Sequence, residues 1–184
     1  MLTLNFEPYP VLSTERLLLR KQRESDADEV LYLRSHKELM KYIPRPLLKD
    51  REDAKTFIRG NLELVSRNEA INWGITSKEE DKVIGFIGLF NFQKEHFRCE
   101  VGYLLHDGWH GKGIMSEALP VVLDYGFRTL QLHSVEATID PDNIASAKVL
   151  EKNNFTRDAY FKENVFYKGR FMDTVIYSLL TPFR

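Results

Sequence analysis

The spacing of apolar residues in the first third of the chain follows a helical period. Apolar positions recur every three or four residues over 27–36 and again over 54–65, and this pattern predicts two amphipathic helices. Ser25 and Asp50 precede these segments and are expected to cap them, because their side chains can accept hydrogen bonds from a first helical turn. The apolar run 17–20 ahead of the first helix predicts a strand.

The period changes in the middle of the chain. Residues 71–75, 83–92 and 99–105 are rich in β-branched and aromatic residues and are separated by charged turns, which is typical of an antiparallel meander. The rest of the chain alternates between the two periods. One helix is expected from the glycine-rich turn 111–113 to about residue 128, and another over 143–152. Strands are expected over 133–139, 155–162 and 171–180. This order predicts an α/β (α+β) domain built on a mixed sheet.

Composition narrows the class of protein. A chain of 184 residues with 43% hydrophobic and 29% charged positions fits one domain, 1–184, that needs no disulfide. A net charge of −1 gives no electrostatic basis for binding nucleic acid. No stretch reaches the roughly 18–20 apolar residues of a membrane span, and the first residues lack a signal-peptide pattern. We therefore expect a cytoplasmic protein with no membrane partner.

The single cysteine and the histidines do not suggest metal chemistry. No Cys/His spacing suits a zinc site, so no metal is expected. Cys99 could act as a nucleophile, but no paired histidine is indicated, and a buried thiol in a strand is the favoured interpretation.

A strand–turn–helix junction around Gly111 and Gly113 carries the strongest chemical pattern. The free N–H groups at the start of a helix, together with the positive end of its dipole, can bind a phosphate. Glycines would let the ligand approach the backbone, and Lys112 adds positive charge. An ordinary turn that needs glycine explains the pattern about as well, and the spacing matches neither the P-loop nor the dinucleotide-binding fingerprint.

The run 110–115, His-Gly-Lys-Gly-Ile-Met, resembles the pyrophosphate loop Q/R-x-x-G-x-G/A of the GNAT superfamily of acyl-CoA-dependent N-acetyltransferases. His110 stands in place of Gln or Arg. Met115 stands in place of a small residue, and its side chain is expected to crowd the loop. The resemblance implies that this loop and the end of the preceding strand bind acetyl-CoA, through Leu104, Leu105, His110, Gly111, Lys112, Gly113, Ile114, Met115 and Ser116.

A second patch, 140–155, resembles the N-x-x-S…L-x-K-x-G-F segment of the same superfamily. The resemblance implies that Asn143 binds the pantetheine arm and that the Ser146 hydroxyl lies near the thiol, where it would stabilise the departing thiolate. Asn143 is also a good helix N-cap, and this structural role accounts for it fully. Asn154 replaces the glycine of the family pattern, and asparagine tolerates the left-handed end of a helix.

Further matches point to one branch of the superfamily. Residues 14–20 look like its opening T-E-R-L-x-L-R strand, 100–103 read Glu-Val-Gly-Tyr before the loop, and 173–180 look like its closing strand. Together they resemble the RimJ/RimL-like branch, the ribosomal-protein serine/alanine N-terminal acetyltransferases, over about 11–181. The resemblance implies the GNAT acyl-CoA N-acyltransferase fold, with a central mixed, mostly antiparallel sheet of about seven strands flanked by four helices.

The implied reaction is direct attack of a primary amine on acetyl-CoA in a ternary complex, with the N-terminal α-amine of a (ribosomal) protein as the first candidate acceptor. Glu100 is the first candidate for the base, although a solvated carboxylate or ion-pair partner is the commoner role for such a residue. Glu163 is the second candidate. Tyr103 and Tyr160 are alternatives to Ser146 as the acid.

Two other functions stay open at this point. The chain could acetylate a small amine, such as a polyamine, an amino acid or an aminoglycoside. It could also be a binding module that senses acyl-CoA without catalysis, an alternative that rests on Met115. The sequence does not decide whether the chain forms a homo-oligomer.

Overall fold

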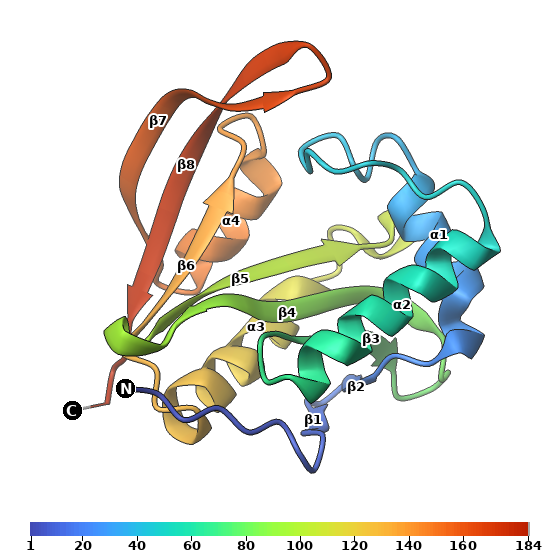
Figure 1. Ribbon diagram of the computed structural model, residues 1–184, viewed down its shortest axis with the longest axis horizontal. Helices are drawn as coiled ribbons and strands as arrows, with labels where there is room; N and C mark the ends of the chain where they lie inside the picture. The colour runs from blue at the N-terminus through green and yellow to red at the C-terminus, as the bar shows by residue number, and fades with distance from the viewer. Residues whose placement is uncertain (184) are drawn as a thin grey trace.

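An eight-stranded mixed sheet runs through the computed structural model, which describes residues 1–183 (Figure 1). The strand order is β1-β2-β3-β4-β5-β6-β8-β7. Neighbouring strands are antiparallel except β5 and β6, which are parallel. The strands are β1 (Leu12–Ser13), β2 (Leu17–Lys21), β3 (Ile71–Ser77), β4 (Val83–Gln93), β5 (Arg98–Leu105), β6 (Ser134–Ile139), β7 (Thr156–Tyr167) and β8 (Arg170–Leu180).

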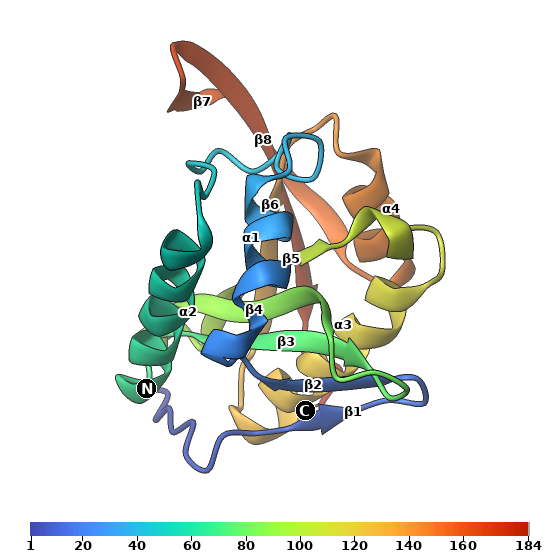
Figure 2. The same cartoon turned by 90° about the vertical axis from the view of Figure 1, so that its right-hand side faces the viewer.

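Four α-helices cover the two faces of this sheet. Helices α1 and α2 lie on one face, and α3 and α4 lie on the other (Figures 1 and 2). Within residues 1–183, no helix is long and apolar enough to cross a membrane. The helices are α1 (Ala27–Ser35), α2 (Arg51–Ser66), α3 (Ile114–Asp124), which continues into a π-helical turn at Tyr125–Thr129, and α4 (Ile144–Lys152).

The sequence predicted this architecture with two errors. The mixed, mostly antiparallel sheet, the β3–β4–β5 meander and the four helices are confirmed. The sheet has eight strands rather than about seven, because the two residues of β1 are too few to give a periodic signal. Ser25 is not a helix cap, since it lies in a 3₁₀ turn and α1 begins after Asp26. Asp50 caps α2 as expected and accepts a hydrogen bond of 2.9 Å from the Asp53 N–H.

Side chains alternate across β5, and this alternation fills two cores. Cys99 and Val101 are buried in the core on the α3 side of the sheet. Leu104 is buried in a second cluster with Leu33 of α1, on the opposite face. Burial raises the pKa of the Cys99 thiol, so the expectation of an inert strand cysteine is confirmed.

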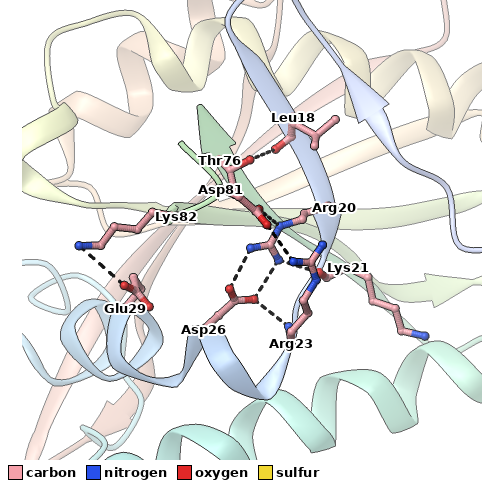
Figure 3. Close-up of polar contacts among 9 residues, drawn as sticks. All are labelled: Leu18, Arg20, Lys21, Arg23, Asp26, Glu29, Thr76, Asp81 and Lys82. Carbon is pink, nitrogen blue, oxygen red and sulfur yellow. Dashed lines mark hydrogen bonds and ion pairs between the residues drawn. The ribbon is translucent and has the colours of Figure 1, made fainter. Parts of the chain in front are cut away.

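A buried arginine joins β2 to the start of α1 (Figure 3). Arg20 is 4% exposed, and its guanidinium donates to both carboxylate oxygens of Asp26 at 2.8 and 2.9 Å. It also donates to Asp81 in the turn between β3 and β4, whose pKa is lowered mainly by this hydrogen bond. Removing one partner of a buried ion pair typically costs about 3–5 kcal/mol, so this network fixes α1 against the sheet.

Candidate active site

The parallel strands β5 and β6 pair over three residues and then separate. Arg98, Cys99 and Glu100 are in register with residues 134–136 of β6. Strand β5 continues to Leu105 without a partner on that side, while its other edge stays paired with β4. Backbone groups between Glu100 and Leu105 therefore face an opening in the sheet, where they can hydrogen-bond to a ligand rather than to a strand.

The opening leads into the loop that begins α3. Gly111 and Gly113 adopt left-handed backbone angles, with φ of 71° and 75°. The described residues supply no hydrogen-bond acceptor to the backbone N–H groups of 111–116. An added Cβ at Gly111 would meet nothing within 4 Å. Open space, free donors and the positive end of α3 together make this loop suited to an anion such as a pyrophosphate.

Side chains of the loop hold its shape rather than fill the space in front of it. The Nε2–H of His110 donates to the carbonyl oxygen of Leu105 at 2.9 Å, which folds the loop back onto the end of β5. The Lys112 ammonium lies 5.1 Å from the centroid of the Trp109 ring and is exposed. His110 thus has a backbone-bracing role here, and Lys112 remains available to a ligand.

The side chain of Met115 does not crowd the loop, contrary to the expectation from sequence. Met115 is 6% exposed and belongs to the core cluster on the α3 side of the sheet. Ile114 is buried in the same cluster. A long apolar side chain is accommodated because the helix turns it into the core.

The first turn of α3 is tied to the turn between β1 and β2. Glu117 accepts hydrogen bonds from the Thr14 hydroxyl, from the Arg16 N–H at 3.0 Å and from the Arg16 guanidinium at 2.6 Å. Arg16 also donates to the carbonyl oxygen of Lys112 at 3.2 Å. These contacts position the loop, and they explain two polar residues of the 14–20 segment that the sequence analysis identified only by resemblance.

Helix α4 begins beside the same opening. The Asn143 side chain accepts a hydrogen bond of 3.1 Å from the Ser146 N–H, which confirms the predicted N-cap. Asn154 follows α4 with φ of 64°, as expected for a left-handed helix end. The Tyr103 hydroxyl donates across the opening to the Ser146 carbonyl oxygen at 3.5 Å. Burial raises the pKa of Tyr103 to about 12, so the phenol keeps its proton at neutral pH.

Glu100 lies on the other face of the sheet from this pair. By strand alternation it shares a face with Leu104, whereas Tyr103 shares a face with Cys99 and Val101. Its carboxylate accepts a hydrogen bond of 3.1 Å from the Asn91 side chain and is half-buried. The structure thus brings Tyr103 and Ser146 together and places Glu100 across the sheet from them.

The two remaining candidates lie in the β7–β8 hairpin. Tyr160 is exposed and donates a hydrogen bond to the Asp173 carboxylate. Glu163 is exposed in an irregular stretch of β7, and its N–H donates to Asp173 at 2.7 Å. No hydrogen bond among residues 1–183 joins either side chain to β5 or α4, so the structure does not bring them to the Tyr103–Ser146 pair.

An aromatic contact that the sequence analysis missed closes the end of β5. The rings of Tyr32 on α1 and His106 stack with centroids 4.4 Å apart. The Tyr32 hydroxyl donates to Asp107 at 2.9 Å. In the part of the chain described here, no group of three or more His, Cys, Asp or Glu side chains could hold a metal ion.

Comparison with known proteins agrees with this geometry. A family model described as an acetyltransferase (GNAT) domain matches residues 16–156. The N-acetyltransferase p20 of Bacillus licheniformis is 36% identical over 169 residues, which cover 92% of this chain and 95% of that protein. The [ribosomal protein uS5]-alanine N-acetyltransferase of Escherichia coli is 27% identical, with coverage of 93% and 91%. A GNAT-family acetyltransferase structure from Bacillus anthracis superposes with a TM-score of 0.83 at 30% identity, covering 93% of this chain and 98% of that one.

Proposed function

This chain belongs to the GNAT acetyltransferase family and is an N-acetyltransferase, and we propose that it transfers the acetyl group of acetyl-CoA to the N-terminal α-amine of a protein, with ribosomal proteins as the first candidates. The observation that carries the proposal is the separation of β5 and β6 beside a loop of unpaired N–H groups. An opening of this kind can take an extended thioester arm while the loop binds its pyrophosphate. In this proposal residues 111–116 bind the pyrophosphate, and Leu104 and Leu105 border the arm.

Asn143 and Ser146 complete the proposed cosubstrate site from the side of α4. The Asn143 side-chain oxygen is engaged by the Ser146 N–H, which leaves its amide N–H groups free to bind the pantetheine arm. The half-buried Ser146 hydroxyl lies beside the Tyr103 phenol, and a hydrogen bond between the two side chains acts to lower the pKa of Tyr103 against the larger effect of burial. In this proposal the Ser146 hydroxyl donates to the thiolate when the cosubstrate is bound.

The proposed transfer needs a base and an acid. The acceptor amine loses a proton and attacks the thioester carbonyl carbon, the C–S bond breaks, and the thiolate takes a proton. Glu100 would accept the amine proton, directly or through water, and Tyr103 or Ser146 would supply a proton or hydrogen bond to the thiolate. Their positions on opposite faces suit an amine that arrives from the α1–α2 side while the thiol leaves on the α3–α4 side.

Two arguments, one from the pKa of the amine and one from the name of a relative, favour an N-terminal amine as the acceptor. The pKa of a protein α-amine is about 7.7–8.0, against about 10.4 for lysine, so a half-buried carboxylate can deprotonate the former near neutral pH. The relative from Escherichia coli is named as an alanine N-acetyltransferase that acts on ribosomal protein uS5. Burial of Met115 removes the feature on which a non-catalytic binding module rested.

Mass spectrometry with three acceptors tests the proposal. The acceptors are a lysine-free peptide with a free N-terminus, the same peptide with a blocked N-terminus and one internal lysine, and a polyamine. We expect acetyl-CoA-dependent addition of one acetyl group to the first acceptor only. Faster modification of the polyamine or of the internal lysine would contradict the N-terminal assignment.

A further inference from the structure

A groove with a strongly basic rim lies between two segments that are distant in sequence. It has a volume of about 340 Å³ and is lined by residues of the loop between α1 and α2 and of the β7–β8 hairpin. The ribbons of these two segments lie at the upper end of Figure 1. We call it the basic groove. Its cationic lining is Lys37, Lys41, Arg45, Lys168 and Arg170, and its other lining residues include Met40, Ile43, Leu47, Tyr167 and Met172.

The five cations of the basic groove have no anionic partner. None of them forms an ion pair among residues 1–183, and all five are exposed. Glu38 is exposed in the same loop but does not line the groove. The whole chain carries a net charge of −1, so this cluster is a local concentration of positive charge. Like charges around a concave surface repel one another and attract an anionic ligand.

Polar atoms beside the groove also lack partners. The Tyr167 hydroxyl, the Arg34 Nε and the His36 Nδ1 are buried and make no hydrogen bond with any described residue. Burial and the nearby charge of Arg45 lower the pKa of Arg34. Buried polar groups are almost always paired, so the Tyr167 hydroxyl in the groove lining and the neighbouring Arg34 and His36 nitrogens favour a polar ligand here.

An apolar cluster connects the floor of the basic groove to the end of β5. The groove's apolar residues Met40, Ile43 and Leu47 pack in the same cluster as Leu104, near the end of β5. The His36 ring, which precedes the groove, lies 5.3 Å from the Tyr32 ring that stacks on His106. An acceptor peptide whose N-terminal amine reaches the opening from the α1–α2 side would therefore place the residues that follow the amine along the basic groove.

We propose that the basic groove binds acidic side chains of the acceptor polypeptide, a few residues beyond the amine that is acetylated. This inference rests on the proposed N-terminal acetyltransferase function and adds the class of acceptor. The mixture of methionine, isoleucine and leucine with five cations suits an extended peptide that alternates apolar and acidic residues. Single-stranded nucleic acid fits less well, since Tyr167 is the only aromatic residue in the lining and base stacking would need more.

The test uses pairs of peptides that share their first residues and differ only in Asp and Glu against Asn and Gln at later positions. Binding to the full chain is measured by fluorescence anisotropy at low and at raised salt, and acetylation of the same peptides gives kcat/KM. The groove variant is Lys41→Gln/Arg45→Gln. The matched control is Lys78→Gln/Lys94→Gln, which removes the same charge from two exposed positions outside the groove.

An exposed ion pair is worth a factor of about 1.4 to 5 in affinity, so the groove variant should bind the acidic peptide about five- to tenfold more weakly than the wild type. The neutral peptide should be unaffected, the control variant should behave as the wild type, and added salt should reduce the preference for the acidic peptide. Equal binding of the two peptides by the wild type would overturn the proposal. Tighter binding of an oligonucleotide of the same charge would also overturn it.

These outcomes separate the groove from the proposed reaction. If neither peptide is acetylated but the acidic one binds selectively and through the groove, the N-terminal acetyltransferase function fails and the binding site stands. If both peptides are acetylated with equal kcat/KM, the function stands and the acidic specificity is wrong.

Discussion

The hydroxyl of Tyr103, on β5, lies 3.5 Å from the carbonyl oxygen of Ser146, in the first turn of α4. This contact crosses the opening that forms where β5 leaves β6. Because burial raises the pKa of Tyr103 to about 12, the phenol stays protonated where an N-terminal amine is free. In the proposed reaction this phenol is the group that gives a proton to the departing thiolate.

Replacement Tyr103→Phe should lower kcat by about a hundredfold or more, in the range of general acid catalysis, and should leave CoA affinity nearly unchanged because the ring remains. Steady-state kinetics and a CoA titration measure the two quantities. Tyr160→Phe, in the exposed hairpin, is the matched control and should keep its activity if Tyr160 is not the acid. A loss of less than tenfold for Tyr103→Phe would indicate packing instead.

The raised pKa of Tyr103 also predicts the alkaline limb of the pH profile. A tyrosine of ordinary pKa, about 10, would lose its proton and its activity near that pH. With the pKa raised to about 12, the wild-type kcat should not decline up to about pH 10 through loss of this proton. A decline centred near pH 10 that disappears in Tyr103→Phe would contradict the buried environment described here.

Replacement Ser146→Ala separates a catalytic hydroxyl from a structural one. The helix cap uses the Ser146 N–H rather than the hydroxyl, whose neighbour is the Tyr103 phenol, so the melting temperature should change little. If the hydroxyl donates to the thiolate, kcat should fall more than CoA affinity, because the interaction develops mainly in the transition state. Equal losses in both would assign Ser146 to ground-state binding.

Replacement Glu100→Gln tests the base. Its carboxylate is half-buried, and the Asn91 amide that it contacts would meet a glutamine oxygen equally well, so the fold should be retained. Activity should fall most at low pH, where little of the amine is free, and should partly recover at alkaline pH. An unchanged pH profile would reject Glu100 and leave Glu163 or bulk water as the base.

Replacement Glu117→Gln tests the anchor of the cosubstrate loop. Burial acts to raise the pKa of Glu117, but hydrogen bonds from Thr14 and Arg16 outweigh it, and the net pKa is lowered. A carboxylate whose pKa is lowered by folding stabilises the folded form fully at pH values above the ordinary pKa of glutamate. This contribution is lost as the pH falls through the lowered pKa of the folded form.

We therefore expect Glu117→Gln to weaken CoA binding about fivefold at neutral pH, the effect of one partly exposed charged contact. The difference from wild type should persist down to about pH 4.3 and vanish only below it. Glu63→Gln, which removes an exposed ion pair in α2, is the control. Equal CoA affinity of Glu117→Gln and wild type would show that the loop holds its shape without the anchor.

Most elements of this fold could be predicted because they have a clear period, and two helices also have a boundary signal in Asp50 and Asn143. The prediction for Ser25 was wrong because the residue after it, Asp26, forms the buried ion pair with Arg20. Helix α1 therefore begins after Asp26 and not after Ser25. Met115 misled it because a loop pattern does not tell which way a side chain turns.

The contacts that were missed are long-range. Glu117 meets Arg16 across 101 residues, and the basic groove combines residues 37–47 with 167–172. Each of these residues alone reads as an ordinary surface charge. Their common position follows only from the strand order, which places the β7–β8 hairpin opposite the α1–α2 loop (Figures 1 and 2).

Calorimetric titration with CoA and with pantetheine, which lacks the pyrophosphate, tests most directly whether residues 111–116 form the cosubstrate site. Gly113→Val is compared with Gly169→Val, because both glycines have positive φ, 75° and 80°, and both would be strained by valine. Hydrogen bonds to charged groups contribute about 1.5–3 kcal/mol each, so the wild type and Gly169→Val should bind CoA at least about 100-fold more tightly than pantetheine. Gly113→Val should lose most of that difference. Equal affinity of the wild type for the two ligands, or identical CoA affinity of the two valine variants, would contradict the assignment.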